Sequence, residues 1–129
     1  MPATKITKIA TVIIPVSDQD KAVGFYCDKL GFELRVDTPF GNGYRWIEVG
    51  VPGESTTIAL APPPENTPTG ARETGISLHT DDIDGLHAQL QDAGVDVDAE
   101  IMRMGDPVPP MFWLRDPDAN SLMVVQVTT

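Results

Sequence analysis

Residues 9–32, IATVIIPVSDQDKAVGFYCDKLGF, place a strand, a capped helix and a glycine stop in direct succession. The run 9–16 is almost entirely apolar and rich in β-branched residues, which is typical of a buried strand. The residues SDQD at 17–20 form an N-capping pattern, and the apolar residues that follow recur at helical spacing. Gly31 is expected to end the helix, because glycine readily adopts the left-handed conformation found just after a helix.

The same order of elements occurs a second time along the chain. Three strands are predicted after the first helix, at residues 32–37, 44–49 and 56–61. The segment 62–73 (PPPENTPTGARE) is rich in proline and polar residues, which predicts a linker. The second copy is predicted as a strand at 76–80, a helix capped by Asp81 or Asp82 and stopped by Gly94, and strands within 95–104, 111–114 and 122–127.

The repeat predicts a single α+β domain over residues 1–129, built from two tandem βαβββ modules. The first module spans 8–61, the linker 62–73 and the second module 74–128. Two such units can each curl four strands, and together they would form a curved mixed sheet, a cup, with the helices outside. His87, on the second helix, is expected to face solvent.

Composition limits the classes of partner. The 129 residues carry a formal net charge of −10, with 19 acidic and 9 basic side chains. That charge disfavours nucleic acid and anionic membranes and favours cationic ligands, although solubility alone also accounts for it. No apolar run has the length of a membrane span. Cys27 is the only cysteine, which excludes an intrachain disulfide and a four-cysteine zinc site. We expect a cytoplasmic protein.

Three segments resemble the vicinal oxygen chelate superfamily, which includes glyoxalases, bleomycin resistance proteins and extradiol dioxygenases. Residues 9–32 resemble the opening of these proteins, and residues 75–94 resemble the start of their second module. Residues 112–126 (FWLRDPDANSLMVVQ) resemble their closing Asp-Pro-Asp-Gly-Asn signature, with Ala119 in place of the glycine. The resemblance implies the doubled βαβββ fold, which hosts unrelated chemistries.

In metal-dependent members of that superfamily, four inward-facing residues bind a divalent ion that holds two vicinal oxygens or dioxygen. Carrying the pattern over places four residues at those positions: Thr11, Ala59, Gly75 and Met123. None is a usual ligand, since alanine and glycine have no donor atom and a thioether is too soft for these ions. The resemblance is therefore closest to the metal-free, bleomycin-resistance-like members, with no metal and no cofactor.

Strand alternation predicts which side chains line the cup. Glu33, Arg35 and Asp37 are expected to point into it, with Leu34 and Val36 under the helix. The candidate ligand-binding residues are Trp46, Tyr44, Glu48, Arg35, His79, Met123 and Trp113. Most have a structural alternative: Trp46 is equally consistent with filling the centre of the cup, Glu48 with pairing to Arg35, and His79 with a surface position.

Three functions are consistent with these residues. The preferred prediction is a metal-free protein that binds a small molecule, cationic or aromatic, for drug or toxin sequestration. Strand exchange or two-fold pairing in similar proteins implies a homodimer, with the cup formed within one chain or across two. The second is a lyase, isomerase or dioxygenase of the same superfamily, with His79 and Glu48 as an acid–base pair or with a metal bound elsewhere. The third is a protein-interaction domain.

Overall fold

Two four-stranded mixed sheets make up the computed structural model, which describes residues 4–41, 43–63 and 69–127. Module one contains β1 (Thr11–Pro15), α1 (Gln19–Gly24), the π-helical turn η1 (Phe25–Lys29), β2 (Glu33–Gly41), β3 (Tyr44–Gly50) and β4 (Thr57–Ala61). Module two contains β5 (Glu73–Thr80), α2 (Ile83–Asp92), β6 (Asp96–Val97), β7 (Met111–Arg115) and β8 (Ser121–Gln126). Within the described residues, no helix is long and apolar enough to cross a membrane.

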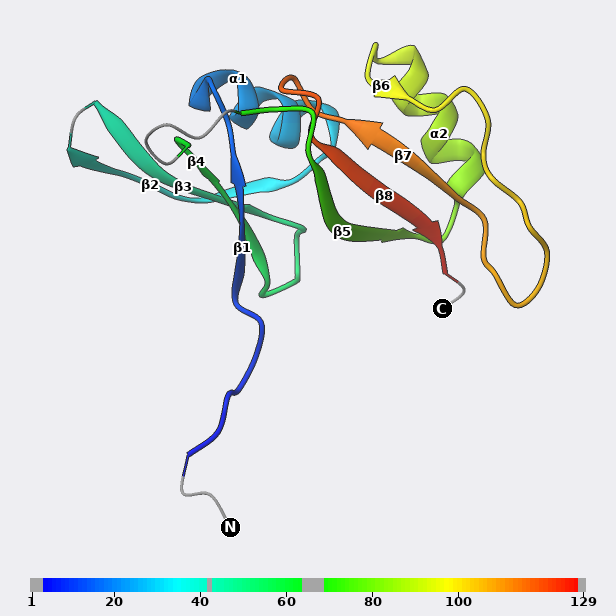
Figure 1. Cartoon of the computed structure of the whole chain (residues 1–129), viewed down its shortest axis with the longest axis horizontal. Helices are drawn as coiled ribbons and strands as arrows, with labels where there is room; N and C mark the ends of the chain where they lie inside the picture. Colours follow the sequence, from blue (N-terminus) through cyan, green and yellow to red (C-terminus); the bar gives the residue numbers. More distant parts are fainter. Residues whose placement is uncertain (1–3, 42, 64–68, 128–129) are drawn as a thin grey trace.

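The strand orders are β1-β4-β3-β2 and β5-β8-β7-β6, so the two modules share one topology. In each, the first strand runs parallel to the last and the others pair antiparallel. The predicted α+β fold of two tandem βαβββ modules is therefore confirmed. β5 begins at Glu73, three residues before the predicted strand, while residues 64–68 of the predicted linker lie outside the described part of the chain. Figure 1 shows the sheets beside each other and residues 4–10 running away from both.

Both helices begin and end where the sequence indicates. The Asp18 side chain accepts a hydrogen bond from the Lys21 amide at 3.0 Å, and Asp82 accepts one from the Gly85 amide at 3.0 Å. Carboxylates at these positions satisfy amide groups that have no partner within the helix. Gly31 and Gly94 follow the helices with φ of +79° and +80°. Of the two predicted caps for α2, Asp82 is the one observed.

The core lies on the sheet faces that carry the helices. In module one it is formed by Ile14, Val16, Ala22, Tyr26, Ile47, Val49, Ile58 and Leu60. In module two it is formed by Ile83, Leu90, Val95, Phe112, Leu114, Leu122 and Val124. The prediction for His87 is wrong, because this side chain is only 9% exposed. It is four residues after Ile83 and three before Leu90, so it shares their buried face. Its ring packs edge-on against Phe112 at 4.8 Å, and Nε2 lies 2.7 Å from the Asp98 carbonyl oxygen.

The closing turn, residues 116–120, joins module two to module one. Asp116 Oδ2 accepts hydrogen bonds from the Tyr26 hydroxyl at 3.0 Å and from Asn120 Nδ2 at 2.9 Å. Its Oδ1 accepts two more, from the amides of Asp118 and Asn120. Asn120 Nδ2 also donates to the Pro15 carbonyl at 3.3 Å. Burial and the nearby Asp116 carboxylate raise the pKa of Tyr26 well above its usual value, so its hydroxyl stays protonated and continues to donate.

Ala119 has a strained backbone conformation in this turn, because its φ is +61°. A side chain in the left-handed region costs roughly 1–2 kcal/mol, and glycine avoids that cost but loses more entropy on folding. We expect Ala119→Gly to raise the free energy of unfolding by about 0.5–1 kcal/mol in urea titrations. Ala93→Gly is the matched control. Ala93 has φ of −80°, so glycine at this position should lower the free energy of unfolding. Equal destabilisation of both variants would refute the strain at Ala119.

Candidate functional site

A chain of hydrogen bonds crosses three strands on the module-one cup face, the side of the sheet away from its core. The Trp46 indole Nε1–H donates to Glu48 Oε2 at 2.7 Å. The Thr57 hydroxyl donates to Glu48 Oε1 at 2.7 Å, and Thr57 Oγ1 lies 3.0 Å from Thr11 Oγ1. The strand register places these side chains on one face, because Glu48 is opposite Ala59 and Thr57 is opposite Thr11. The predicted candidates Trp46 and Glu48 are thus brought into direct contact.

Glu48 is held as a carboxylate by these contacts. The hydrogen bond from Trp46 lowers its pKa most, the hydrogen bond from Thr57 lowers it further, and partial burial opposes both. A carboxylate that accepts hydrogen bonds is stabilised in its charged form. Glu48 therefore contributes a negative charge to the cup face at neutral pH, and each of its oxygens accepts a hydrogen bond.

The prediction that Asp37 points into the cup is wrong, and so is the placement of Val36 under the helix. A register shift between Leu34 and Val36 inserts one extra residue, Arg35, into β2. An extra residue reverses the faces of everything beyond it. Val36 is therefore opposite Glu48, on the cup face.

Arg35 pairs with Glu33 rather than with Glu48. Its Nε donates to Glu33 Oε1 at 2.6 Å, and its Nη2 donates to the Val51 carbonyl at 2.6 Å. The guanidinium lies against Gly50, where a β-carbon would come within 2.9 Å of Cζ. Arg35 is thus held at the end of β3, next to the turn that leads to β4.

Tyr44 lies at the start of β3, near the tip of the β2–β3 hairpin. Its ring stacks on Phe40 at 6.3 Å between centroids, with 29° between the planes. Both rings are largely exposed, at 47% for Tyr44 and 55% for Phe40. The hairpin therefore presents an aromatic pair at the end of the sheet, beyond the Trp46–Glu48 contact.

The module-two cup face carries the remaining candidates in adjacent rows. Trp113 is opposite Met123, which is opposite Ser77 on β5. His79 is opposite Val125 in the next row, and its side chain is exposed. His79 and Glu48 lie on different sheets, and no hydrogen bond among the described residues joins them. The predicted acid–base pair is thus not assembled by a direct contact.

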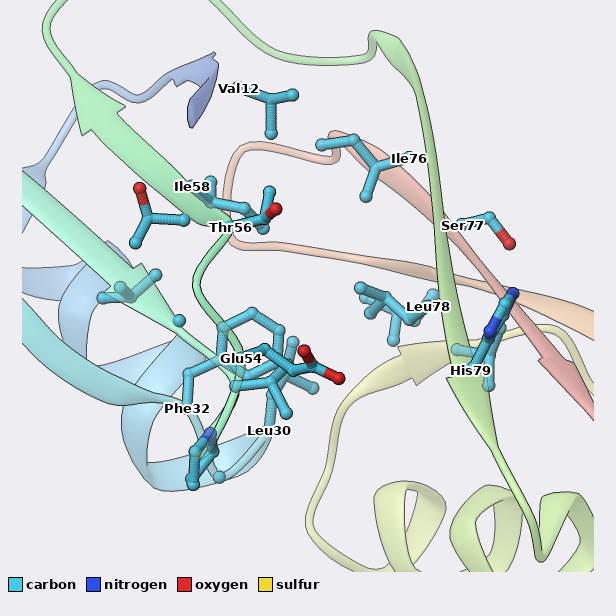
Figure 2. Close-up of a pocket in the computed structure, with 18 of the residues that line it drawn as sticks. Val12, Leu30, Phe32, Glu54, Thr56, Ile58, Ile76, Ser77, Leu78 and His79 are labelled. Carbon is cyan, nitrogen blue, oxygen red and sulfur yellow. The ribbon is translucent and has the colours of Figure 1, made fainter. Parts of the chain in front are cut away.

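A cleft of about 600 Å³ separates β1 and β4 from β5. Figure 2 shows Val12 and Ile58 on one side, Ile76 and Leu78 on the other, and His79 at one end. The lining is mainly aliphatic, with Thr57, Ser77 and Glu54 among its polar residues. Its size and character suit a small-molecule site. Sequence reasoning missed it, because alternation assigns these aliphatic residues to the core and contains no signal for a gap between modules.

Comparison with known proteins decides the family. The model of the Glyoxalase/Bleomycin resistance protein/Dioxygenase superfamily matches residues 8–124. The chain belongs to this superfamily. It is 34% identical to TnmS3, an antibiotic binding protein from Streptomyces sp. CB03234, covering 97% of this chain and 99% of that one with a TM-score of 0.83.

Two other proteins similar to this chain differ in the roles that they are given. A superfamily member from Sphaerobacter thermophilus DSM 20745 is 36% identical, with 95% and 98% of the two chains covered and a TM-score of 0.84. A probable lactoylglutathione lyase from Synechocystis sp. (strain ATCC 27184 / PCC 6803 / Kazusa) is 28% identical, covering 91% of this chain and 93% of that one. The relatives of this superfamily member thus include both a binding protein and a probable enzyme.

The residues predicted to stand at the superfamily's metal positions do not fit a divalent ion. The Thr11 hydroxyl is engaged by Thr57, and Met123 lies between Trp113 and Ser77 in the sheet. Ala59 and Gly75 offer no side-chain donor. In the part of the chain that the structure describes, no group of three or more His, Cys, Asp or Glu side chains is placed to hold a metal.

Proposed function

We propose that this superfamily member binds a small aromatic ligand without a metal and sequesters it in the cytoplasm. The observation that carries the proposal is a half-buried tryptophan on each cup face: Trp46, held by Glu48, and Trp113, beside Met123. Tryptophan provides a large, rigid surface for stacking. The similarity to an antibiotic binding protein over nearly the whole chain supports binding as the role of this scaffold.

Charge favours a cationic ligand. The chain has a net charge of −10, so the overall field of the protein attracts cations. A cation over an indole face is attracted by the ring quadrupole as well as by this net negative charge. An aromatic compound with a positive charge would use both features.

A second copy of the chain would complete the site as a homodimer. Apolar side chains stand exposed along β1 and the residues before it: Ile13 is 60% exposed, Ile9 74% and Ile6 92%. Exposed apolar surface of this kind is typical of an interaction surface. The two faces of one chain lie on separate sheets, so a two-fold pairing could bring the module-one face of one copy to the module-two face of the other.

An enzyme is the alternative, and two observations favour it. His79 lies at the cleft with an exposed ring, available for proton transfer, and one relative is a probable lactoylglutathione lyase. Such an activity would require a metal bound away from the superfamily positions or acid–base chemistry at His79.

Metal analysis and thermal-shift measurements test the proposal together. After incubation with Zn²⁺, Mn²⁺, Ni²⁺ and Fe²⁺ and then desalting, we expect less than a tenth of an ion per chain by elemental analysis, and a mass of two chains by light scattering. Bleomycin, the aromatic cation ethidium and S-hexylglutathione are the probes. A bound probe at about 100 times its Kd should raise Tm by roughly 10 °C. Stoichiometric metal would favour the enzyme, and no shift with any probe would favour a protein-interaction domain.

A further inference from the structure

We infer that Glu48 is a positioning residue, whose carboxylate holds the Trp46 indole so that its ring face stays available to a stacking ligand. The stacking role of Trp46 rests on the proposed function, whereas the positioning of its ring does not. The inference assigns Glu48 neither to proton transfer nor to direct pairing with a cation.

The geometry of β3 supports this role. Trp46 and Glu48 are two residues apart on one strand, so their side chains leave the same face. The 2.7 Å contact from Nε1 to Oε2 is a hydrogen bond to a charged acceptor, the stronger class of such bonds. It fixes the one polar atom of the indole and thereby the direction of the ring.

Glu48 is itself anchored by the two neighbouring strands. Thr57, only 7% exposed on β4, donates to its second oxygen, and Thr11 on β1 lies 3.0 Å from the Thr57 hydroxyl. A side chain held at both oxygens has little freedom to swing toward a ligand. The resemblance places the first metal ligand of the superfamily at Thr11, and in this chain the Thr11 side chain supports the anchor of an aromatic ring.

The same contacts argue against a role for Glu48 as a general base. A general base needs a pKa near the working pH. The hydrogen bonds to Glu48 lower its pKa rather than raise it. Each oxygen keeps a second acceptor site, so the comparison of Glu48→Gln with Glu48→Ala decides whether the charge pairs with a cation.

The fluorescence of Trp46 tests the inference in the purified protein without any ligand. In a Trp113→Phe background Trp46 is the only tryptophan, so its emission and acrylamide quenching report on one side chain. Glu48→Ala is expected to raise the quenching constant about two-fold. Glu48→Gln should keep the native value, because its amide oxygen can accept from the indole and its NH₂ can donate to Thr57. Glu100→Ala, at an exposed carboxylate of module two, is the matched control and should change nothing.

Acid titration adds a readout that a merely structural role would not produce. The folded-state pKa of Glu48 is lowered, so the carboxylate should protonate only below its ordinary value of 4.5 as the pH falls. The emission of Trp46 should titrate in that range in the parent protein and not in Glu48→Gln. Quenching raised equally by Glu48→Gln and Glu48→Ala, or an identical titration in both proteins, would overturn the inference.

Ethidium titration then separates positioning from direct binding by charge. Positioning predicts that Glu48→Gln retains affinity within about three-fold, while Glu48→Ala loses ten-fold or more. Equal losses would show that the charge itself binds the cation and would overturn the inference. If ethidium binds none of the proteins, ethidium is rejected as a ligand under the proposed function. The fluorescence series still decides the role of Glu48.

Discussion

Replacing Asp116 by alanine is expected to lower the free energy of unfolding by about 3–5 kcal/mol, the largest stability effect that the structure indicates. Its side chain is 6% exposed and accepts four hydrogen bonds, from the Tyr26 hydroxyl, from Asn120 Nδ2 and from the amides of Asp118 and Asn120. Alanine would leave these buried donors without an acceptor. Each such group costs roughly 1–3 kcal/mol, although local water entry would recover part of the loss.

The effect should be large relative to the whole protein, since domains of this kind are stable by about 5–15 kcal/mol. Urea unfolding followed by circular dichroism measures it. Tyr26→Phe removes only one of the four donors and should cost about 1 kcal/mol. Asp92→Ala, on the exposed end of α2, is the charge-matched control and should change stability by less than 0.5 kcal/mol, roughly the usual surface effect. A loss below 1 kcal/mol for Asp116→Ala would refute its role in joining the modules.

Trp46→Ala is expected to have the largest effect on ligand binding, weakening the binding of ethidium by roughly 30-fold or more, as for other aromatic residues at the centre of a binding site. The loss follows from removal of the stacking surface that Glu48 holds in place. Trp46→Phe keeps a ring but loses the indole N–H, so an intermediate loss is expected. Isothermal titration calorimetry of the parent protein and of both variants measures these affinities.

Leu34→Ala is the control for this series. Leu34 is 47% exposed and lies opposite Val49, on the face of the sheet away from Trp46. The substitution removes apolar surface from the same module without changing the cup face. We therefore expect the affinity for ethidium to stay within two-fold of the parental value. Binding by Trp46→Ala at the parental affinity would remove Trp46 from the proposed site and leave the aliphatic cleft as the candidate.

The accuracy of sequence reasoning differed along the chain for identifiable reasons. Alternation placed Trp46 and Glu48 on one face correctly because β3 runs without interruption from Tyr44 to Gly50. The same rule misplaced Asp37, since a bulge at Arg35 has no local signal that alternation can detect. His87 was misjudged by its polarity, while its spacing from Ile83 and Leu90 already indicated the buried face.

Short-range patterns by themselves determined the repeated βαβββ unit, its helix caps and the glycine stops, because capping and periodicity depend on residues within one or two turns. They also predicted that the four positions where the resemblance places the superfamily's metal ligands hold no suitable ligand. Tertiary structure alone decided the partners of the two key carboxylates. Asp116 accepts a hydrogen bond from Tyr26, and Glu48 accepts one from Thr57. Each of these contacts joins different elements of the fold, so it depends on strand register and on how the modules pack. The cleft between β1 and β5 has the same origin, since its walls come from different modules.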